Sequence, residues 1–568
     1  MKITTTQISF EERADQLSLE DITNTLVDDN IFGVARKALL AKGAKLLVGP
    51  RGTGKTHTMR NAYSIALKDS NQPIAVYATF NRYLNLEPML NRQADSMKRF
   101  HSWVLAKLLL GCFQALHDSK SPSTCLTDAE PLFDSERLNT LVTHLERRSE
   151  SSVYEDIGQF LTIDLVHRAF EIIRVQQKRQ RVVVFLDDAA LSLVDEFLAA
   201  FFEIFRLLKT ETVSPKASVY PGSTQYGPTF HVAHESQEVM LWLDVTDPTY
   251  LTTMGKISNR RLKANEKNAL GEDTLDAFKY LSFGIPRAYL RLLREFMANT
   301  AGSSQSRMNK VVESHVELIR TEYESLGLKL NQFASIIRAG EEFFDATVDA
   351  LVEAKKVDAK DSHRNIILGL NQGIEKNQLQ KRMLGFLVEV GMIHKLAEVN
   401  HGPGRRYIRF IPHLAFIASA GLFRQGKGSS ASDVCEYMKR PAKRQPVRRD
   451  LSKLLNSQAI EKIKLDLPPC QKCSTARLNE AQRYCHACGT LLIIVSKFEE
   501  CMKLKLSKVP GISPKLAGRL KAEAITTVEQ VMASQDPTRE VRAAKMIGPI
   551  RAQKIVEQVS AIVEEFLA

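Results

Sequence analysis

The chain has 568 residues, of which 44% are hydrophobic and 25% are charged, so it has the composition of a globular protein and enough length for several domains. Its net charge of +13 and pI near 9.2 favour an anionic partner such as nucleic acid, although scattered surface lysines would give similar totals. No apolar run reaches the roughly 18 residues that cross a bilayer, and the first residues lack a basic-then-apolar signal pattern, so we expect a cytoplasmic protein with no membrane partner.

The first half of the chain alternates between helical and strand patterns. Residues 1–43 have a helical pattern and lead into a short apolar strand. The predicted strands are 45–48, 73–80, 181–188 and 239–245. Buried strands separated by helices predict a parallel α/β core over 1–270, and the long interval before the third strand predicts a helical insertion at about 85–175. No further strand is evident after Arg261.

The stretch that follows the first strand has the pattern G-x-x-x-x-G-K-[ST], carried by Gly49, Gly54, Lys55 and Thr56. Its backbone N–H groups and the helix amino terminus suit phosphate, the lysine reaches the terminal phosphates, and the threonine offers an oxygen to Mg²⁺. The predicted ATP-contacting residues are Gly49, Pro50, Arg51, Gly52, Thr53, Gly54, Lys55, Thr56 and His57. The alternative is a glycine-rich turn without a ligand.

A phosphate-binding loop of this kind needs a carboxylate for Mg²⁺ and usually a second one that orients water. The run "VVVFLDD" ends in both. Asp187 is the predicted metal-side carboxylate, together with Thr56, and Asp188 is the predicted water-polarising group. The alternative is a strand followed by an acidic helix cap. Asp188 is shorter than the glutamate that many relatives carry, which is compatible with slow, switch-like turnover.

These motifs resemble the AAA+ and STAND superfamily of P-loop ATPases, and within it the initiator ATPases of the origin-recognition and archaeal replication type. "LWLDVTD", with Asp244, looks like the sensor 1 strand. "KISNRRLK" looks like the arginine-finger segment, in which Arg260 or Arg261 would reach the γ-phosphate of a neighbouring subunit. "FGIPRAYLRLLREF" is similar to the lid helix, with Arg287 as the sensor 2 arginine.

The resemblance covers about residues 20–300. It implies that Arg261 and Arg287 stabilise charge on the transferred phosphoryl group and that Asp244 contacts the nucleotide. The alternatives are an ordinary strand end and arginines on solvated helix faces.

Behind the core, strand signals largely stop, and we expect a helical lid over 271–369. Residues 370–423 combine a helix with a basic hairpin that turns at Gly402 to Gly404, which resembles a winged helix. Its exposed cations, Arg405, Arg406 and Arg409, would lie along a phosphate backbone. The alternative is a winged helix used for packing or protein contact. Residues 424–464, rich in Gly, Ser, Pro and charge, are predicted to be a basic linker.

Cys470, Cys473, Cys485 and Cys488 have the spacing C-x2-C-x11-C-x2-C. Two close cysteine pairs can enclose one Zn²⁺ in a closed tetrahedral site with no open position for chemistry. We therefore expect a structural zinc ribbon at 465–495. A redox pair is the alternative.

The last segment, 496–568, resembles a tandem of helix-hairpin-helix motifs that contact DNA phosphates through a tight turn. Gly511 permits the first turn. Lys515 and Arg519 share one helix face in the first copy, as Arg551 and Lys554 do in the second. Ser513 replaces the usual second glycine and Pro549 changes the second turn, which leaves a purely structural second hairpin open. A protein-docking domain is the alternative.

The expected fold is therefore multidomain: an α/β P-loop ATPase core, a helical lid, a winged helix, a zinc ribbon and a small all-α helix-hairpin-helix domain. The leading hypothesis is an ATP- and Mg²⁺-dependent ATPase that also binds Zn²⁺ and duplex DNA with little sequence preference. We expect a homo-oligomer or a hetero-complex. One alternative is an ATP-gated regulatory subunit of a bacterial defence or transposition system, and another is a scaffold that does not hydrolyse ATP.

Overall fold

The computed structural model describes most of the chain. The described residues are 14–80, 96–147, 156–188, 195–222, 229–300, 302–357, 362–400, 406–424, 430–444, 446–475, 484–492, 501–532 and 537–567, with the single positions 224, 226, 227, 402, 477 and 482. They form two compact units. Unit 1 comprises Met1–Ala75, Ser214–Thr224 and Val232–Leu467, and unit 2 comprises Val76–Val213, Gln225–His231 and Pro468–Ala568.

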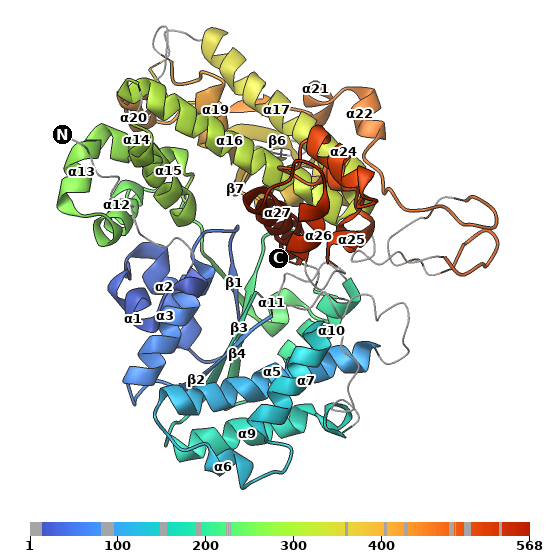
Figure 1. Cartoon of the computed structure of the whole chain (residues 1–568). Helices are drawn as coiled ribbons and strands as arrows, with labels where there is room; N and C mark the ends of the chain where they lie inside the picture. The colour runs from blue at the N-terminus through green and yellow to red at the C-terminus, as the bar shows by residue number, and fades with distance from the viewer. Residues whose placement is uncertain are drawn as a thin grey trace. The chain divides into compact units, whose positions relative to one another are not determined.

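Unit 1 contains the phosphate-binding motif, together with the elements from β5 to α22 (Figure 1). Its first elements are η1 (Ala14–Gln16), α1 (Leu19–Asn24), α2 (Asn30–Leu40), β1 (Lys45–Val48), α3 (Lys55–Lys68), β4 (Val213–Val219), α11 (Val232–Glu235) and β5 (Gln237–Met240). Two helices follow, α12 (Tyr250–Arg261) and α13 (Ala264–Leu270), and the segment predicted to be the lid then contains α14 (Glu272–Leu281), α15 (Pro286–Ala298), α16 (Ser304–Lys329), η3 (Asn331–Phe333) and α17 (Ala334–Val357). The helical lid expected over 271–369 is therefore formed by helices from α14 to α17, whereas its last described residues, 362–369, leave the helical pattern and enter the strand β6 (Leu368–Asn371).

The remaining elements of unit 1 form a second, smaller sheet with helices. They are β6 (Leu368–Asn371), η4 (Gln372–Lys376), α18 (Gln378–Glu389), β7 (Ile393–Asn400), β8 (Arg406–Pro412), α19 (Leu414–Ser419), α20 (Ala431–Lys439), β9 (Val447–Arg449), α21 (Leu451–Leu454) and α22 (Ser457–Glu461). The strands lie in the order β7-β8-β6-β9. β8 is antiparallel to both β7 and β6, whereas β9 is parallel to β6.

Unit 2 contains the predicted helical insertion and the carboxyl-terminal modules. Its elements are β2 (Ile74–Thr79), α5 (Ser96–Asp118), α6 (Thr124–Thr127), α7 (Ser135–Arg147), η2 (Gly158–Phe160), α9 (Ile163–Gln176), β3 (Val182–Asp187), α10 (Asp195–Leu208), η5 (Leu506–Lys508), α24 (Pro514–Ala522), α25 (Val528–Met532), α26 (Pro537–Ala543) and α27 (Pro549–Leu567). Aromatic rings fill the insertion's core: Phe100 stacks on Phe197 with centroids 4.4 Å apart. The described part of 85–175 is therefore helical, as its pattern predicts.

The large sheet has the strand order β2-β3-β4-β1-β5. Within unit 1, β1 pairs in parallel with β4 and with β5, so that Lys45 lies opposite Lys216 on one side and Gln237 on the other. The parallel α/β core is thus confirmed. The fourth predicted strand begins and ends earlier than expected, because the chain leaves the ladder after Leu241, whose N–H still donates to Val48 O at 2.7 Å.

The sequence pattern missed β4, which reads "VSPKASV". All seven residues are nevertheless buried. The strand contains a proline and a lysine, both of which are usually taken as signs against a central strand. Lys216 is fully buried, and its ammonium group donates to Ala41 O at 2.6 Å and also to Gly43 O. Both carbonyls lie just after the carboxyl end of α2. The buried lysine therefore links the end of that helix to the sheet.

We expect Lys216→Met to lower the free energy of unfolding by about 2–3 kcal/mol, because two buried carbonyls would lose their donor. Lys45→Met is the matched control: Lys45 lies opposite on the neighbouring strand, and its exposed ammonium group donates to the Gln237 side chain. The control should cost less than about 0.5 kcal/mol. Urea unfolding followed by circular dichroism measures both. Equal losses would show that Lys216 has no special role.

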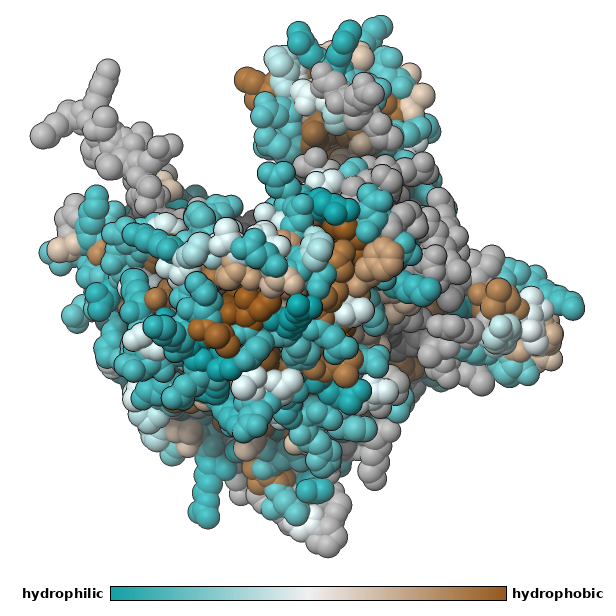
Figure 2. All heavy atoms as spheres, turned by 90° about the horizontal axis from the view of Figure 1, so that it is seen from below, coloured by the Kyte–Doolittle hydropathy of each residue, from teal (hydrophilic) through white to brown (hydrophobic). Residues whose placement is uncertain are grey.

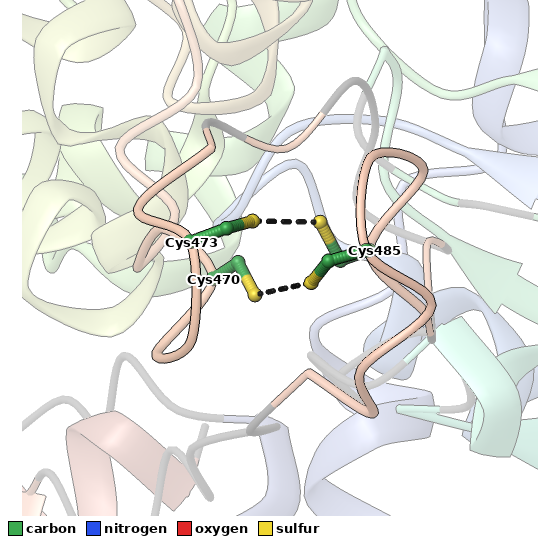
Figure 3. Close-up of side chains that lie close together, drawn as sticks. Cys470, Cys473 and Cys485 are labelled. Carbon is green, nitrogen blue, oxygen red and sulfur yellow. Dashed lines mark hydrogen bonds between the residues drawn. The ribbon is translucent and has the colours of Figure 1, made fainter.

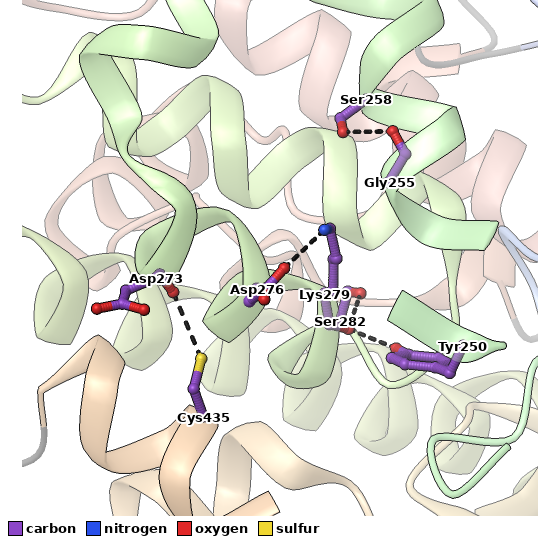
Figure 4. A network of polar contacts seen from close by, with 8 residues as sticks. All are labelled: Tyr250, Gly255, Ser258, Asp273, Asp276, Lys279, Ser282 and Cys435. Carbon is purple, nitrogen blue, oxygen red and sulfur yellow. Dashed lines mark hydrogen bonds and ion pairs between the residues drawn. The ribbon is translucent and has the colours of Figure 1, made fainter. Parts of the chain in front are cut away.

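The predicted linker at 424–464 is wrong for its described residues. α20, β9, α21 and α22 lie in it, and β9 adds a parallel strand beside β6. Ser430 forms a capping box with Asp433, and the helix buries Val434 and Tyr437. The segment is amphipathic as well as cationic: one face of α20 is apolar and buried, and the charged residues lie on the other. Figure 4 shows the Cys435 thiol beside Asp273, whose carbonyl oxygen it approaches at 3.6 Å.

A helix followed by a hairpin, the order expected for a winged helix, is present as α18, β7 and β8. Of its predicted phosphate contacts, Arg405 lies outside the described residues, Arg406 is exposed, and Arg409 donates to Ala397 O at 2.9 Å. α18 buries five consecutive residues, from Met383 to Leu387, which leaves that stretch no free face. The winged-helix assignment stays a prediction, with the hairpin as its exposed part.

Figure 2 shows a surface on which hydrophilic residues predominate and hydrophobic ones form small groups. Single exposed apolar side chains are normal on globular proteins, so most need no partner. Every helix in the described part of the chain is too short or too polar to span a bilayer.

Candidate functional site

The phosphate-binding motif forms a tight loop between β1 and α3. Gly52 and Gly54 adopt left-handed backbone angles, with φ of +86° and +95°. A Cβ atom on Gly49 would lie 2.6 Å from Thr53 Oγ1 and 2.7 Å from Leu241 O. These positions require glycine because a side chain would either strain the backbone or collide with it. The loop therefore has the bent conformation that its sequence pattern predicts.

Lys55 is the first residue of α3 and is only 7% exposed. Its ammonium group donates to Gly49 O at 2.6 Å and to Pro50 O at 3.1 Å, and it lies 4.1 Å from the centroid of the Tyr220 ring. Two backbone carbonyl groups of the loop and the face of the Tyr220 ring therefore hold the Lys55 ammonium group beside the loop. The sequence did not reveal Tyr220, because it follows β4, the strand that the pattern missed.

The backbone of Arg287 lies against the loop, and its sensor 2 role stays a prediction. Its N–H donates to Gly52 O at 3.2 Å, and a Cβ on Gly52 would be 3.1 Å from Arg287 Cβ. Pro286 is the first residue of α15, and Arg287 therefore lies in its first turn. A hydrogen bond between backbone groups therefore links the phosphate-binding loop to the first turn of α15.

A turn before α15 sets this position. Phe283 and Gly284 both have positive φ, and a Cβ on Gly284 would lie 2.1 Å from Leu243 O. The Tyr250 hydroxyl accepts a hydrogen bond from Gly284 N at 2.9 Å. It donates to Lys279 O, and both of these residues are drawn in Figure 4. Burial raises the pKa of Tyr250, so the hydroxyl keeps its proton. The residues that place Arg287 come from α12, α14 and the segment after β5.

Asp244 follows β5, and its carboxylate bonds a neighbouring residue of the same segment. Its Oδ1 accepts hydrogen bonds from the N–H and the hydroxyl of Thr246, both at 2.7 Å. Two residues earlier, Trp242 stacks on His394 with centroids 4.3 Å apart. Burial lowers the pKa of His394, while the Asp244 carboxylate opposes this shift. The sensor 1 role of Asp244 stays a prediction.

The structure places Arg261 close to α3 of the same chain. Its charge is among the causes that lower the pKa of His57, after burial and together with Arg60. The two arginines and burial bring that pKa to about 4, and His57 Nε2 lies 3.1 Å from Thr25 Oγ1. A role of Arg260 or Arg261 towards a neighbouring subunit stays a prediction. Pro50, Arg51, Thr53 and Thr56 lie in the loop and first turn as expected, and Arg51 approaches Glu322 at 4.0 Å.

The neutral state of His57 makes stability depend on pH. The unfolded chain takes up the proton below a pKa of 6.5, whereas the folded state takes it up only near 4. The stabilising effect is therefore complete above pH 6.5 and is lost as the pH falls towards 4. Through His57, the free energy of unfolding of wild type should fall by about 2 kcal/mol between about pH 6.5 and 5. In His57→Gln this part of the fall should be absent. Urea unfolding at both pH values tests this, with the exposed His117→Gln as a control whose profile should match wild type.

The two predicted carboxylates lie in unit 2, at the end of β3. Asp187 is 1% exposed and accepts hydrogen bonds from the Tyr77 hydroxyl at 2.6 Å and from Asp188 N at 3.1 Å. Asp188 has a φ of +55°, so the chain bends sharply after the strand. Tyr77 on β2 is a hydrogen-bond partner of Asp187 that the sequence did not reveal. The Mg²⁺ and water-orienting roles stay predictions.

The loop residues fit a nucleoside triphosphate. Glycines at positive φ keep the backbone open to phosphate, the amino terminus of α3 follows directly, and the Lys55 ammonium group is available to exchange carbonyl oxygens for phosphate oxygens. Thr56 would hold Mg²⁺.

The four cysteines come together as their spacing predicts. Their sulfur atoms all lie within 4.8 Å of one another, with Cys470 to Cys488 at 3.5 Å and Cys473 to Cys485 at 3.4 Å (Figure 3). Sulfurs around zinc at about 2.3 Å are close to 4 Å apart. Hydrogen bonding with Thr490 lowers the pKa of Cys488 to about 6, and hydrogen bonding with Thr475 lowers that of Cys473, which favours thiolate. The donor set fits one Zn²⁺.

The last module contains two hairpins with the same backbone. Gly511 has a φ of +86° and Met546, at the matching position, a φ of +63°. Ile512 and Ile547 follow and are buried at 4% and 5% exposed. α24 and α27 both begin with proline, at Pro514 and Pro549. The sequence suggested that Pro549 changes the second turn, and this prediction is wrong. Pro549 matches Pro514, and Gly548 matches Ser513.

The same correspondence shows that the two hairpins carry their cations at different positions. Arg519 matches Lys554, but Lys515 matches Ile550, while Arg551 matches Leu516. The second hairpin therefore presents a different surface from the first.

Comparisons with known proteins agree with the last module. Residues 503–560 match the family model of the SAM-like helix-hairpin-helix tandem, which confirms that prediction. No curated protein matches the chain significantly. Among solved structures, a Walker-type ATPase of Pyrococcus abyssi is 14% identical with a TM-score of 0.36, and the similarity covers 69% of this chain and 95% of that one. The Orc1 protein of Aeropyrum pernix, solved in complex with DNA, is 13% identical with a TM-score of 0.27, over 72% of this chain and 91% of that one.

Proposed function

We propose that the protein is a Mg²⁺-dependent ATPase that binds DNA and uses the nucleotide as a switch. The observation that carries this proposal is the loop at 49–56, in which glycine conformation, a helix amino terminus and a buried lysine combine as phosphate binding requires. Arg287, whose backbone bonds Gly52, is the group through which the nucleotide would influence the lid.

The roles of the residues follow from their positions. Lys55 binds the terminal phosphates after release from its carbonyls, and Thr56 with Asp187 holds Mg²⁺. Asp188 orients water, while Arg287 and Arg261 stabilise charge on the transferred group. The Tyr77 hydroxyl, which donates to Asp187, keeps that buried carboxylate oriented. Turnover on the switch timescale is compatible with the short reach of Asp188.

DNA binding is proposed for the carboxyl-terminal modules. The helix-hairpin-helix tandem supports it, since its first hairpin has Gly511 at the turn and the exposed Lys515 in the first turn of α24. Such a turn reads phosphates, so we expect little sequence preference. The zinc-binding segment would hold the chain in shape near the tandem without taking part in chemistry, with Cys470, Cys473, Cys485 and Cys488 as the Zn²⁺ ligands.

Two measurements test the proposal. Single-turnover release of γ-phosphate from MgATP should fall at least about 100-fold in Lys55→Ala, because the group that neutralises the terminal phosphates is lost. Lys42→Ala, an exposed lysine before β1, is the matched control and should keep the wild-type rate. No heat of MgATP binding in calorimetry on folded protein would refute the ATPase proposal.

Anisotropy of labelled duplex DNA at rising salt tests the second part. The affinity should fall steeply with salt, because phosphate contacts release counterions. Absence of binding at low salt, with and without nucleotide, would refute the DNA proposal and favour a regulatory subunit that acts on a protein. Sizing the particle with ATP and with ADP tests the proposed assembly into a homo-oligomer or hetero-complex.

A further inference from the structure

The two hairpins of the carboxyl-terminal module differ where they are exposed. The first has glycine and lysine, Gly511 and Lys515, at its tip. The second has Met546 and Ile550 at the matching positions, and they are 76% and 86% exposed. Ile550 is the most exposed large hydrophobic side chain among the residues that the structure describes. The two hairpins therefore have the same backbone conformation but expose different side chains.

Met546 has a conformation that favours glycine. Its φ of +63° puts it in the left-handed region, where a side chain costs free energy that Gly511 avoids in the first hairpin. Gly511 carries no side chain at the tip of the first hairpin, where the Gln558 amide lies beside it, whereas the tip of the second hairpin carries the exposed Met546 side chain. The second hairpin is therefore built to present an apolar side chain and not a bare backbone.

Arginines surround this apolar pair. The guanidinium groups of Arg519 and Arg551 both donate to the Met546 carbonyl oxygen, at 3.5 and 3.3 Å. Lys545, next in the chain, is exposed. Cations fixed beside exposed apolar side chains suit a partner with anionic groups next to apolar faces, which is the surface of a base step between phosphates.

We propose that the second hairpin is a wedge: Met546 and Ile550 contact base faces in DNA whose base pairs are open, while the first hairpin holds a phosphate. The proposal rests on the proposed DNA binding and names its preferred substrate, a duplex with unpaired or unstacked bases. In an intact duplex the base faces are covered by their neighbours, so the apolar pair finds no partner until the stack is opened. Opening costs least where bases are already mismatched.

The experiment compares two labelled duplexes of equal length, one fully paired and one with a central run of mismatches, bound by the full chain. Wild type should bind the mismatched duplex about 10-fold more tightly, since contact with one or two bases contributes roughly that factor. Met546→Ser with Ile550→Ser should bind both duplexes alike, with the wild-type affinity for the paired one. Lys515→Gln should weaken binding to both by the same factor, because it alters only the phosphate-reading hairpin.

Several outcomes overturn the wedge. One is equal affinity of wild type for both duplexes, and another is a mismatch preference that survives in the double variant. A change in the sedimentation of the double variant without DNA would assign the apolar pair to a contact between copies of the chain. Absence of binding to either duplex would refute the proposed DNA binding itself, which separates the two failures.

Discussion

Gly284→Ala should be among the most damaging single substitutions in the chain. The added Cβ would lie 2.1 Å from the Leu243 carbonyl oxygen, at a residue whose φ is +74°. The turn must then move, and with it Arg287, whose N–H bonds Gly52 in the phosphate-binding loop. We expect a loss of about 3–5 kcal/mol in the free energy of unfolding. We also expect at least about a 100-fold loss in ATP turnover in the variant that remains folded, because small displacements of catalytic groups are costly.

Gly271→Ala is a control that separates the cost of a positive φ from the cost of a steric clash with the added Cβ. Gly271 also has a positive φ, +75°, but no atom lies within 4 Å of an added Cβ. This control should cost about 1–3 kcal/mol, because a φ of +75° with a ψ of 152° strongly favours glycine, and it should leave turnover unchanged. Thermal unfolding and single-turnover phosphate release measure both variants. If the two alanines behave alike, the contact with Leu243 does not position the lid.

Removal of the metal should have the second large effect. The purified chain should contain one zinc ion per molecule, measured by mass spectrometry of the metal, because four sulfur atoms lie within 4.8 Å of one another. Structural zinc contributes about 10–16 kcal/mol of binding free energy in small peptides, and that free energy also folds the segment. We therefore expect Cys470→Ser combined with Cys485→Ser to lose the metal and to expose the segment to proteolysis, while the rest of the chain stays folded.

Cys125→Ser is the control for the thiol chemistry. Cys125 is half-exposed and lies in α6, outside the cysteine cluster. This variant should keep both the zinc and the proteolytic pattern of wild type. A folded wild-type chain that holds no zinc after expression in zinc-supplemented medium would contradict the prediction, as would full zinc content in the double variant.

Local patterns in the sequence were sufficient where one short segment makes the whole feature. The loop at 49–56, the four cysteines and the paired hairpins each depend on residues a few positions apart, so glycine conformation and ligand spacing could be read directly. The same holds for β1, β2 and β3, whose apolar runs predict buried strands.

Contacts between segments far apart in the chain decided the remainder. β4 carries Lys216 in a buried strand because the carbonyls of Ala41 and Gly43 accept its protons, and no pattern within seven residues reveals such partners. α20 and β9 fold within a cationic stretch because β6 lies beside β9. Arg287 meets Gly52 because Tyr250 and Gly284 shape the preceding turn. Hydrogen bonding and packing at long range set these positions, whereas the sequence by itself determined which groups are available for chemistry.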